Sequence, residues 1–395
     1  MVEAAGVHTR IAARGRHVLA LQDTSEINYQ AKAGRKQELG PVGNGTDLGL
    51  FVHPVLALDA ETRECLGLAD LQVWRRAPTK VAARRTRPIE AKESFRWLKG
   101  AAAAQQRLSG AWLITVVGDG ESDIFEHWAR TPDARVEVLA RAAQDRALVG
   151  GGLLFATLSG FAEAARYTLA LPARPRRPAH TATLAVRFGE VVLQRPSTLK
   201  KAGPAEVVLR AIEVREIDPP AGVEAVHWRL LTTHAVATAA EAQQIVEWYC
   251  ARWTIEQLFR TLKRQGLGLE DSLIEDGAAL ERLATLAVIA ATTTMQLVQA
   301  RSSTALGPPA SRVFAADQIP VLVALQDRLE GRTAKQRNPH PPRTLAWAAW
   351  IIARLGGWTG YASERPPGPI TMRNGLNRFA AIHQGYSLAK DVCAR

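Results

Sequence analysis

Two short apolar runs, each followed by an aspartate, constrain the fold of this chain more than any other feature. Residues 17–22, HVLALQ, predict a buried strand that ends at Asp23, and residues 111–117 predict a second strand that leads into a glycine-flanked turn with Asp119. Taken singly, an acidic residue after an apolar strand is usually a turn or helix cap. If Asp23, Asp119 and Glu256, which lies on a predicted helix, meet at the carboxyl ends of adjacent strands, cations are needed to offset their repulsion. Such hard oxygen ligands suit magnesium or manganese, and few ligands per ion leave room for water and a phosphate.

The remaining pattern predicts a mixed α/β chain with a β-rich region in its middle. Residues 150–236 contain short alternating runs separated by Pro, Gly and Lys clusters, which favours strands. The other predicted elements are two strands within 48–74, a helix over 90–108, a helix starting near Ser122, a strand over 134–142, a helix over 278–301 and a mostly helical tail from 314. The apolar stretches at 283–298 and 345–358 are interrupted and too short to span a bilayer, so no membrane partner is expected.

The totals favour a multi-domain protein with a polyanionic partner. A length of 395 residues suggests two or three domains. The chain has 50 Lys and Arg against 38 Asp and Glu, a formal net charge of +12, which points first to nucleic acid and second to an anionic membrane surface. Its 3 cysteines form no CxxC pair, and its 9 histidines show no paired zinc spacing. Together with an N-terminus that lacks the apolar core of a signal peptide, these features predict an intracellular protein.

A basic, Pro-containing stretch follows the second predicted strand of residues 48–74. Before any acidic residue it carries Arg75, Arg76, Lys80, Arg84, Arg85 and Arg87. A solvated linker and a loop that contacts a nucleic-acid backbone explain this composition equally well.

Residues 247–268, EWYCARWTIEQLFRTLKRQGLG, predict one amphipathic helix. At about 100° per residue, four polar side chains share one narrow stripe beside its apolar face: Tyr249, Arg252, Glu256 and Lys263. A solvated flank with charge pairs is the simpler interpretation of such a stripe. A phenol, a guanidinium, a carboxylate and an ammonium that point one way can also hold a metal and a phosphate chain.

These motifs together resemble those of the DDE transposases of bacterial cut-and-paste insertion sequences, in the insertion-sequence-four family. The four residues of the stripe match that family's Y-(2)-R-(3)-E-(6)-K signature at every spacing. Its first acidic motif is matched by LALQDTSEINY with Asp23, and its second is matched in part by VVGDGESD with Asp119. The resemblance runs over nearly the whole chain and includes the segments GLFVHPVLAL and ARLGGWTG.

The resemblance implies a catalytic triad of Asp23, Asp119 and Glu256 that binds two Mg²⁺ or Mn²⁺ ions per active site. None of the implied steps needs a covalent intermediate with the protein.

The resemblance also implies that DNA phosphates are held by the other residues of the stripe, Tyr249, Arg252 and Lys263, with Arg260 as a further DNA contact. For Trp228, in HWRLLTT, it implies stacking on a base flipped out of the duplex. A core position on a short strand is the equally weighted alternative.

The fold implied by the resemblance is an RNase H-like α/β core, a mixed five-stranded sheet with helices that is interrupted by a β-rich insertion. Residues 1–150 and 238–302 would form the core, 151–237 the insertion, and 303–395 a C-terminal helical dimerisation region. Self-association there is expected to involve residues at helical spacing, namely Trp347, Trp350, Ile351 and Leu355.

The implied function is cut-and-paste DNA transposition. It comprises metal-dependent cleavage at the insertion-sequence ends, a hairpin intermediate and strand transfer into target DNA. A homodimer would act in a synaptic complex in the bacterial cytoplasm, associated with the nucleoid.

Two departures from the family pattern leave alternatives open. Gly120 stands where the family usually has an arginine directly after the second aspartate, so one phosphate contact is expected to be missing. Only 22 residues, with one weak strand and no helical DNA reader, are expected before Asp23, where relatives carry a DNA-binding module. Two other functions are weighed. One is an RNase H-like nuclease or resolvase, against which the Tyr, Arg and Lys spacing and the large β-rich insertion speak. The other is a truncated regulator that binds DNA and dimerises with an active transposase.

Overall fold

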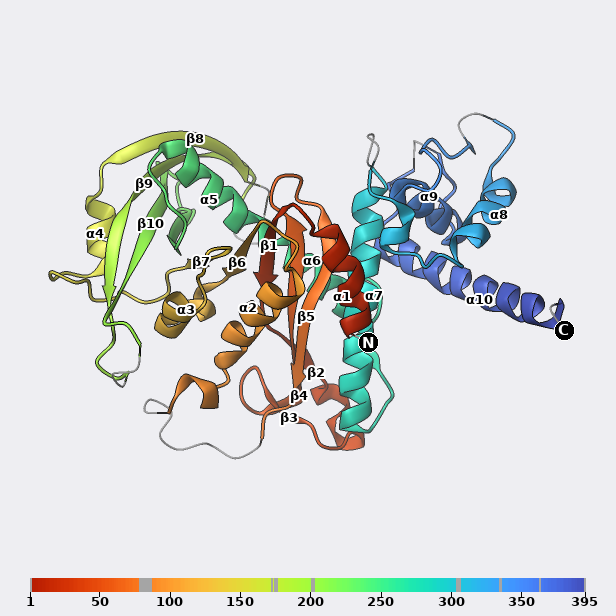
Figure 1. Ribbon diagram of the computed structural model, residues 1–395, viewed down its shortest axis with the longest axis horizontal. Coiled ribbons are helices and arrows are strands. Elements are labelled where there is room, and N and C mark those ends of the chain that lie inside the picture. The colour runs from red at the N-terminus through yellow and green to blue at the C-terminus, as the bar shows by residue number, and fades with distance from the viewer. Residues whose placement is uncertain are drawn as a thin grey trace. The chain divides into compact units, whose positions relative to one another are not determined.

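Figure 1 shows the fold of the chain, which is a computed structural model that describes residues 2–77, 87–171, 173, 177–199, 203–302, 307–333, 336–361 and 364–393. The chain divides into two compact units. The first unit consists of Met1–Arg14, Thr24–Pro78 and Thr254–Arg395, and the second consists of Gly15–Asp23 and Thr79–Trp253. The division at Trp253 falls within residues 238–302, which were expected to form one part of the core, and the predicted domain boundaries stay predictions.

The second unit is built on a mixed sheet with the strand order β1-β6-β7-β11-β10-β9-β8. Its strands are β1 (His17–Gln22), β6 (Leu113–Gly118), β7 (Val136–Arg141), β8 (Glu163–Leu171), β9 (His180–Gln194), β10 (Glu206–Ile217) and β11 (His227–Thr232). Strands β1, β6 and β7 are parallel, whereas β11 joins β7 antiparallel and β10, β9 and β8 continue in antiparallel pairs. The strands of the β-rich region therefore extend the sheet that contains the two aspartate-terminated strands.

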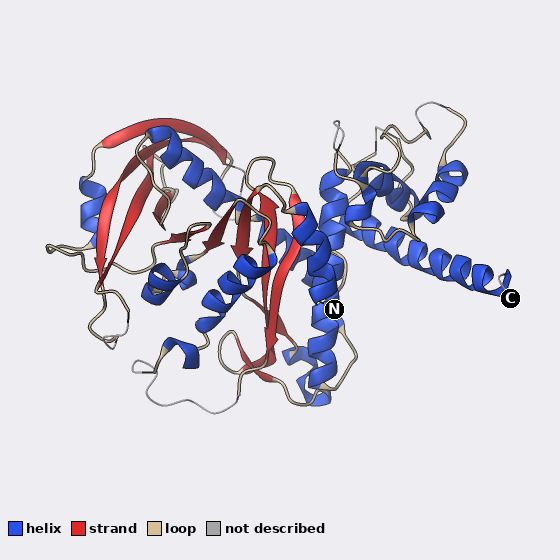
Figure 2. Ribbon diagram, viewed as in Figure 1, coloured by secondary structure: helices blue, strands red, loops and turns tan. Residues whose placement is uncertain are grey.

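Burial along the strands distinguishes the two parts of this sheet. Strand β1 is buried from its second residue onward, and β6 is similar, as expected for parallel strands with both faces covered. Strand β8 alternates between more and less exposed residues, which is typical of an antiparallel strand with one face toward solvent. Figure 2 shows β8, β9 and β10 as long curved strands, in red.

Helices and short 3-10 helices complete the second unit: η2 (Ile89–Ala91), α2 (Phe95–Arg107), η3 (Gly120–Ser122), α3 (Phe125–Arg130), α4 (Leu154–Gly160) and α5 (Ala239–Ala251). The predicted helix over 90–108 corresponds to η2 and α2, whereas α4 was not predicted. Helix α5 begins at a capping box in which the Thr238 hydroxyl accepts the Glu241 N–H and the Glu241 carboxylate accepts the Thr238 N–H.

The first unit combines a small antiparallel sheet with most of the helices. Its strands are β2 (Ser25–Asn28), β3 (Gly40–Val42), β4 (Asp47–Asp59) and β5 (Cys65–Trp74), and β4 pairs with each of the other three. Its helices are α1 (Val2–Ala12), η1 (Gln30–Arg35), α6 (Thr254–Lys263), η4 (Leu269–Asp271), α7 (Gly277–Ala300), η5 (Ala310–Arg312), α8 (Ile319–Leu329), α9 (Leu345–Leu355) and α10 (Pro369–Cys393).

The N-terminal segment differs from the prediction of one weak strand, because it contains α1 before β1. Helix α1 packs on β5 of the first unit, where the Thr9 hydroxyl donates to the Leu68 carbonyl at 3.0 Å. A side chain at Gly67 would collide with Thr9, since a Cβ there would lie 2.3 Å from its hydroxyl oxygen. This close packing makes α1 an integral part of the first unit.

The 24-residue helix α7 is long and apolar enough to cross a membrane by length and composition, which the interrupted stretch 283–298 did not suggest. In the first unit, however, 56% of its apolar window is buried, and it packs against β5, α9 and α10. The apolar character of α7 is therefore that of a core helix.

The predicted self-association residues lie inside the protein. Trp347, Trp350, Ile351 and Leu355 of α9 are all buried in one hydrophobic core with residues of α7, α8 and α10. They pack the first unit itself and are not available to a second copy. Exposed apolar side chains lie instead on the C-terminal half of α10, namely Ile382, Tyr386, Leu388 and Val392.

Candidate functional site

Asp23 and Asp119 follow neighbouring parallel strands of the second unit at the same level. In the register of β1 and β6, Leu21 lies opposite Val117, so the residues two positions further along each chain are Asp23 and Asp119. The carboxyl ends of parallel strands meet at one edge of a sheet. Asp23 and Asp119 therefore follow neighbouring strands at one edge of the sheet of the second unit, and their role as metal ligands stays a prediction.

The turn after β6 depends on a glycine. A Cβ at Gly118 would lie 2.3 Å from the hydroxyl oxygen of Ser122 and 3.1 Å from the ring of Trp97. Ser122 is buried and its hydroxyl donates to the backbone carbonyl of Asp119 at 2.6 Å. Asp119 Oδ1 accepts the N–H of Glu121 at 2.8 Å, so Asp119 also caps η3, as the simpler interpretation predicted.

Asp123, the last residue of DGESD, anchors this turn through contacts of its buried carboxylate. Its carboxylate is buried and forms an ion pair with Arg146 at 2.8 Å. It also accepts the Trp128 Nε1–H at 3.0 Å and the backbone N–H groups of Ala143 and Gln144 at 3.0 and 3.2 Å. A buried carboxylate with this many donors is satisfied as a charged group. Asp123 therefore fixes the loop that carries Asp119.

Arg252 connects the end of α5 to Asp23. Its Nη1 donates to Asp23 Oδ2 at 2.8 Å, and both side chains are mostly buried, at 9% and 14% exposed. The Arg252 guanidinium also lies 5.9 Å from the Tyr249 ring centroid. Two members of the predicted stripe thus lie at the aspartate edge of the second unit.

The Tyr249 hydroxyl lies in a charged environment. Burial raises its pKa above the ordinary value, while the neighbouring Arg252 and Arg141 lower it and Asp119 raises it. Because burial is the largest of these effects, the hydroxyl stays protonated at neutral pH and can donate a hydrogen bond.

Arg141 is a residue of this edge that the sequence interpretation missed. Gly118 lies opposite Ala140 in the parallel pair of β6 and β7, which places Arg141 level with Asp119. Its Nε and Nη2 atoms lie 3.7 Å from the position of a Cβ at Gly120. A guanidinium therefore occupies the surroundings of Gly120, where the family pattern has an arginine. The available signal was that Arg141 lies near the end of the strand predicted over 134–142, as Asp23 and Asp119 lie just after theirs.

The predicted single helix over 247–268 is wrong, because the helix is interrupted at Arg252 and Trp253. There the N–H groups of Arg252 and Trp253 bond to Tyr249 and Cys250, three residues back. These tighter turns end α5 before α6 starts, and no Pro or Gly marks the break in the sequence. The predicted stripe assumed one continuous helix, so it describes relative directions only within α5 and within α6, not across the break.

Within the first unit, α6 presents Glu256 and Lys263 on one side. They are seven residues apart, so about 20° separates them around the helix axis. Both are partly buried beside a buried face of Ile255, Leu258, Phe259 and Leu262, whereas Arg260 is exposed. Lys263 Nζ lies 3.8 Å from Glu270 Oε1.

Trp228 lies on β11 opposite Val214 of β10. It is partly buried, so one side packs on the sheet and the rest is accessible. The role of this residue stays a prediction, with base stacking and core packing both open.

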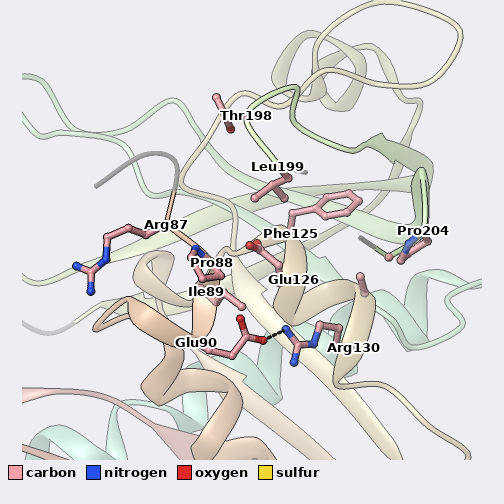
Figure 3. A pocket seen from close by; sticks show the side chains of 12 residues that line it. Arg87, Pro88, Ile89, Glu90, Phe125, Glu126, Arg130, Thr198, Leu199 and Pro204 are labelled. Atoms are coloured by element: carbon pink, nitrogen blue, oxygen red, sulfur yellow. Dashed lines mark hydrogen bonds and ion pairs between the residues drawn. The ribbon is translucent and has the colours of Figure 1, made fainter. Parts of the chain in front are cut away.

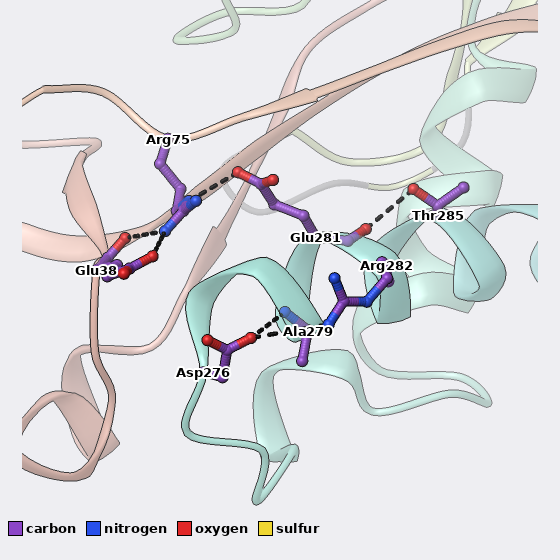
Figure 4. Close-up of polar contacts among 7 residues, drawn as sticks. All are labelled: Glu38, Arg75, Asp276, Ala279, Glu281, Arg282 and Thr285. Carbon is purple, nitrogen blue, oxygen red and sulfur yellow. Dashed lines mark hydrogen bonds and ion pairs between the residues drawn. The ribbon is translucent and has the colours of Figure 1, made fainter.

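Two arginines of the basic stretch are already engaged in the first unit. Arg75 forms ion pairs with Glu38 at 2.8 Å and Glu281 at 2.7 Å (Figure 4). The Arg76 guanidinium lies 4.1 Å from the Phe51 ring centroid. These contacts hold the end of β5, and the choice between a solvated linker and a backbone-contacting loop for the rest of the stretch stays open. Lys80, Arg84 and Arg85 lie outside the described residues.

A cavity of about 520 Å³ in the second unit is separate from the aspartate edge. Figure 3 shows it lined by apolar side chains such as Ile89, Phe125 and Leu199, with Arg87 among the lining residues and the Glu90–Arg130 ion pair beside it. None of the predicted site residues lines this cavity.

The donor set at the aspartate edge suits a divalent metal. Among the described residues no group of three or more His, Cys, Asp and Glu side chains is arranged to hold a metal ion. Asp23 and Asp119 supply carboxylate oxygens at one level, and such oxygens are the ligands that Mg²⁺ and Mn²⁺ prefer.

Residues 98–293 match the family model described as Transposase DDE domain. The match includes Asp119 and all four residues of the stripe, Glu256 among them, and it excludes Asp23. It supports a DDE transposase, whereas the insertion-sequence-four family is not part of the match.

Among solved structures, the chain is similar to that of a piggyBac transposase synaptic complex with hairpin DNA, determined by cryo-EM. The likeness has 7% identity and a TM-score of 0.34, and it covers 72% of this chain. The chain spans about half the length of that protein, 47%. A TM-score this low does not establish a common fold.

Proposed function

We propose that this protein is a DDE transposase that cleaves DNA at the ends of an insertion sequence and joins them to target DNA. The observation that carries the proposal is the placement of Asp23, Asp119 and Arg141 at one level, at the carboxyl ends of three adjacent parallel strands. Two carboxylates for metal and a cation for phosphate are thereby offered by one rigid edge. The family-model match over residues 98–293 supports the same function.

In this proposal Asp23, Asp119 and Glu256 hold two Mg²⁺ or Mn²⁺ ions. When bound, such ions activate the attacking oxygen and stabilise the leaving oxygen of an in-line displacement at phosphorus. The protein's own contribution is the fixed position of the carboxylates, since the Asp119 turn is held by Asp123 and Ser122.

The cations would hold the DNA backbone. Arg141, whose Nε and Nη2 lie 3.7 Å from a Cβ at Gly120, would supply the cation that is missing at position 120. Arg252, which donates to Asp23, would also contact a phosphate. The Tyr249 hydroxyl, which burial keeps protonated, donates to a phosphate oxygen. Lys263 and Arg260 add positive charge from α6.

The finer features of the proposal come from the motifs. They are an RNase H-like core, membership of the insertion-sequence-four family, a hairpin intermediate supported by Trp228, and a homodimeric synaptic complex acting in the bacterial cytoplasm. For self-association we propose the exposed apolar residues in the C-terminal half of α10 in place of those of α9, because the α9 residues are buried.

The test is nicking of supercoiled plasmid DNA with Mg²⁺ or Mn²⁺. Asp119→Ala and Glu256→Ala should each reduce the rate by roughly 10³-fold or more, because several kcal/mol of metal-dependent stabilisation are lost. Binding of a duplex should change little. Gln257→Ala, at an exposed neighbour of Glu256 on α6, is the matched control and should nick normally. Undiminished nicking by Glu256→Ala would contradict the proposal, and a parent protein that binds DNA without nicking it would favour the regulator.

A further inference from the structure

A carboxylate of the first unit lies beside Lys263 and is itself held from another direction. Glu270 is in η4, and its Oε1 lies 3.8 Å from Lys263 Nζ. The same oxygen accepts the backbone N–H of Asn28, in β2, at 3.1 Å. The two side chains are 24% and 31% exposed, so a phosphate can reach the ammonium.

The turn that carries Glu270 is fixed on the N-terminal part of the unit. Lys36 Nζ, beyond η1, donates to the Ser272 and Ile274 carbonyls at 2.9 and 2.6 Å. Lys32 Nζ donates to the Asp271 carbonyl at 2.6 Å, and Leu269 is buried. Gly268 starts the turn in the left-handed region, with φ +54°, which favours glycine. Glu270 is therefore mounted on a rigid support.

The surroundings of Glu270 on the β2 side are equally fixed. The Asn28 side chain donates to Asp47 at 2.8 Å and accepts the Gln30 N–H at 2.8 Å, which orients the backbone of β2 at this point. Tyr29 is buried, and burial followed by the Glu270 charge raises its pKa well above the ordinary value. The Tyr29 hydroxyl thus stays neutral beside the carboxylate.

A fixed carboxylate at this distance has a specific effect on a lysine. The lysine side chain is long and flexible, and ordering it opposes binding. A contact at 3.8 Å is an ion pair without a hydrogen bond, so Glu270 attracts the ammonium but does not use its N–H donors. The ion pair thus keeps the Lys263 ammonium in place and leaves its N–H donors able to bind a phosphate.

We propose that Glu270 is a positioning residue, which holds the Lys263 ammonium in place for a DNA phosphate during cleavage. The inference rests on the proposed function and goes beyond it, because Glu270 is outside the stripe and touches no substrate. It predicts that the charge of Glu270 matters to turnover through Lys263.

The test measures plasmid nicking with Mn²⁺ at saturating DNA and the affinity for a random-sequence duplex, using the full chain. Glu270→Gln keeps an acceptor for Asn28 and removes the charge. We expect the maximal rate to fall roughly tenfold and the dissociation constant to change less than about twofold. Asp271→Asn is the matched control, since it removes a charge from the same turn at a side chain that is 88% exposed, and it should behave as the parent.

The decisive measurement is coupling between the two residues. In a Lys263→Ala background, Glu270→Gln should cause no further loss of rate. The same loss in that background would overturn the proposal, as would faster nicking with tighter DNA binding, which would mean that Glu270 restrains Lys263.

Thermal unfolding of each variant checks that its fold is intact. Glu270→Asp, which withdraws the charge by one methylene, should reduce the nicking rate less than Glu270→Gln. Full nicking by Glu256→Ala would instead overturn the proposed function, whatever the Glu270 variants do.

Discussion

The aspartate edge of the second unit and the α6 side of the first unit hold their polar groups by different means. At the edge, Asp23, Asp119 and Arg141 are level because three parallel strands have a fixed register. On α6, Glu256 and Lys263 share a side because of helix periodicity. Lys263 lies 3.8 Å from Glu270, in a turn whose carbonyl groups accept hydrogen bonds from Lys32 and Lys36. Register positions main-chain atoms through many hydrogen bonds, whereas the α6 arrangement depends on a few long side chains. The aspartate edge should therefore tolerate single surface substitutions better than the α6 side does.

Acid should distinguish the two units most strongly. Burial lowers the pKa of His127 to about 4, and burial together with the charge of His17 lowers that of His234 to about 3; both histidines lie in the second unit. Below the unfolded value of about 6.5, the unfolded chain takes up protons that the folded unit does not. The contribution of each histidine to the free energy of unfolding is therefore complete above about pH 6.5. It decreases as the pH is lowered, by roughly 2 kcal/mol per histidine at pH 5.

Hydrogen exchange at pH 7 and pH 5, corrected for intrinsic rates, measures this effect. Amides of β6 and β7 should lose protection at pH 5 more than those of α9. His127→Gln should reduce the difference, and His8→Gln, at an exposed position of α1, should leave it unchanged. Equal losses in both units would contradict the prediction.

Gly118→Ala tests the close packing behind the aspartate edge. The new Cβ would meet Ser122 at 2.3 Å and 2.6 Å, at its oxygen and its own Cβ, so the turn with Asp119 has to shift. We expect a loss of roughly 1–3 kcal/mol in the free energy of unfolding, together with a loss of nicking. Denaturant unfolding gives the first quantity. The control is Gly6→Ala in α1, where nothing lies within 4 Å, and where alanine should be neutral or stabilising. Normal stability and nicking of Gly118→Ala would show that the turn tolerates the displacement.

The smallest expected effect is that of Arg141→Ala on DNA binding. It compares a cation at the end of a strand with Lys263, a cation on α6. If Arg141 and Lys263 each neutralise one phosphate, each alanine variant should lower the salt-dependence slope of DNA binding by about one, and the double variant by about two. The measurement is duplex binding over a range of salt concentrations. Arg328→Ala removes an equal charge from the exposed side of α8 and should leave the slope unchanged. An unchanged slope for Arg141→Ala would contradict a phosphate contact by Arg141 and leave it only a structural role beside the Gly120 turn.

Local sequence determined much of the secondary structure. The run HVLALQ forms β1 with the predicted bounds, and the segments predicted as strands over 48–74 and as a helix over 278–301 are β4, β5 and α7 within a few residues. These predictions are confirmed because apolar periodicity and strand length are local properties. The aspartates after β1 and β6 were found for the same reason.

Tertiary structure decided what no local pattern records. The importance of Arg141 follows from the pairing of β6 with β7, and the break at Arg252 carries no Pro or Gly signal. Trp347 and Trp350 have a spacing that fits a surface stripe or a core, and only the packing of α7, α8 and α10 around α9 shows that they are core. The sequence by itself thus determined which residues bear charge at the ends of strands. Which of them meet, and which polar neighbours hold them, depends on contacts between residues far apart in the chain, because strand order and side-chain packing are set by the burial of the whole unit.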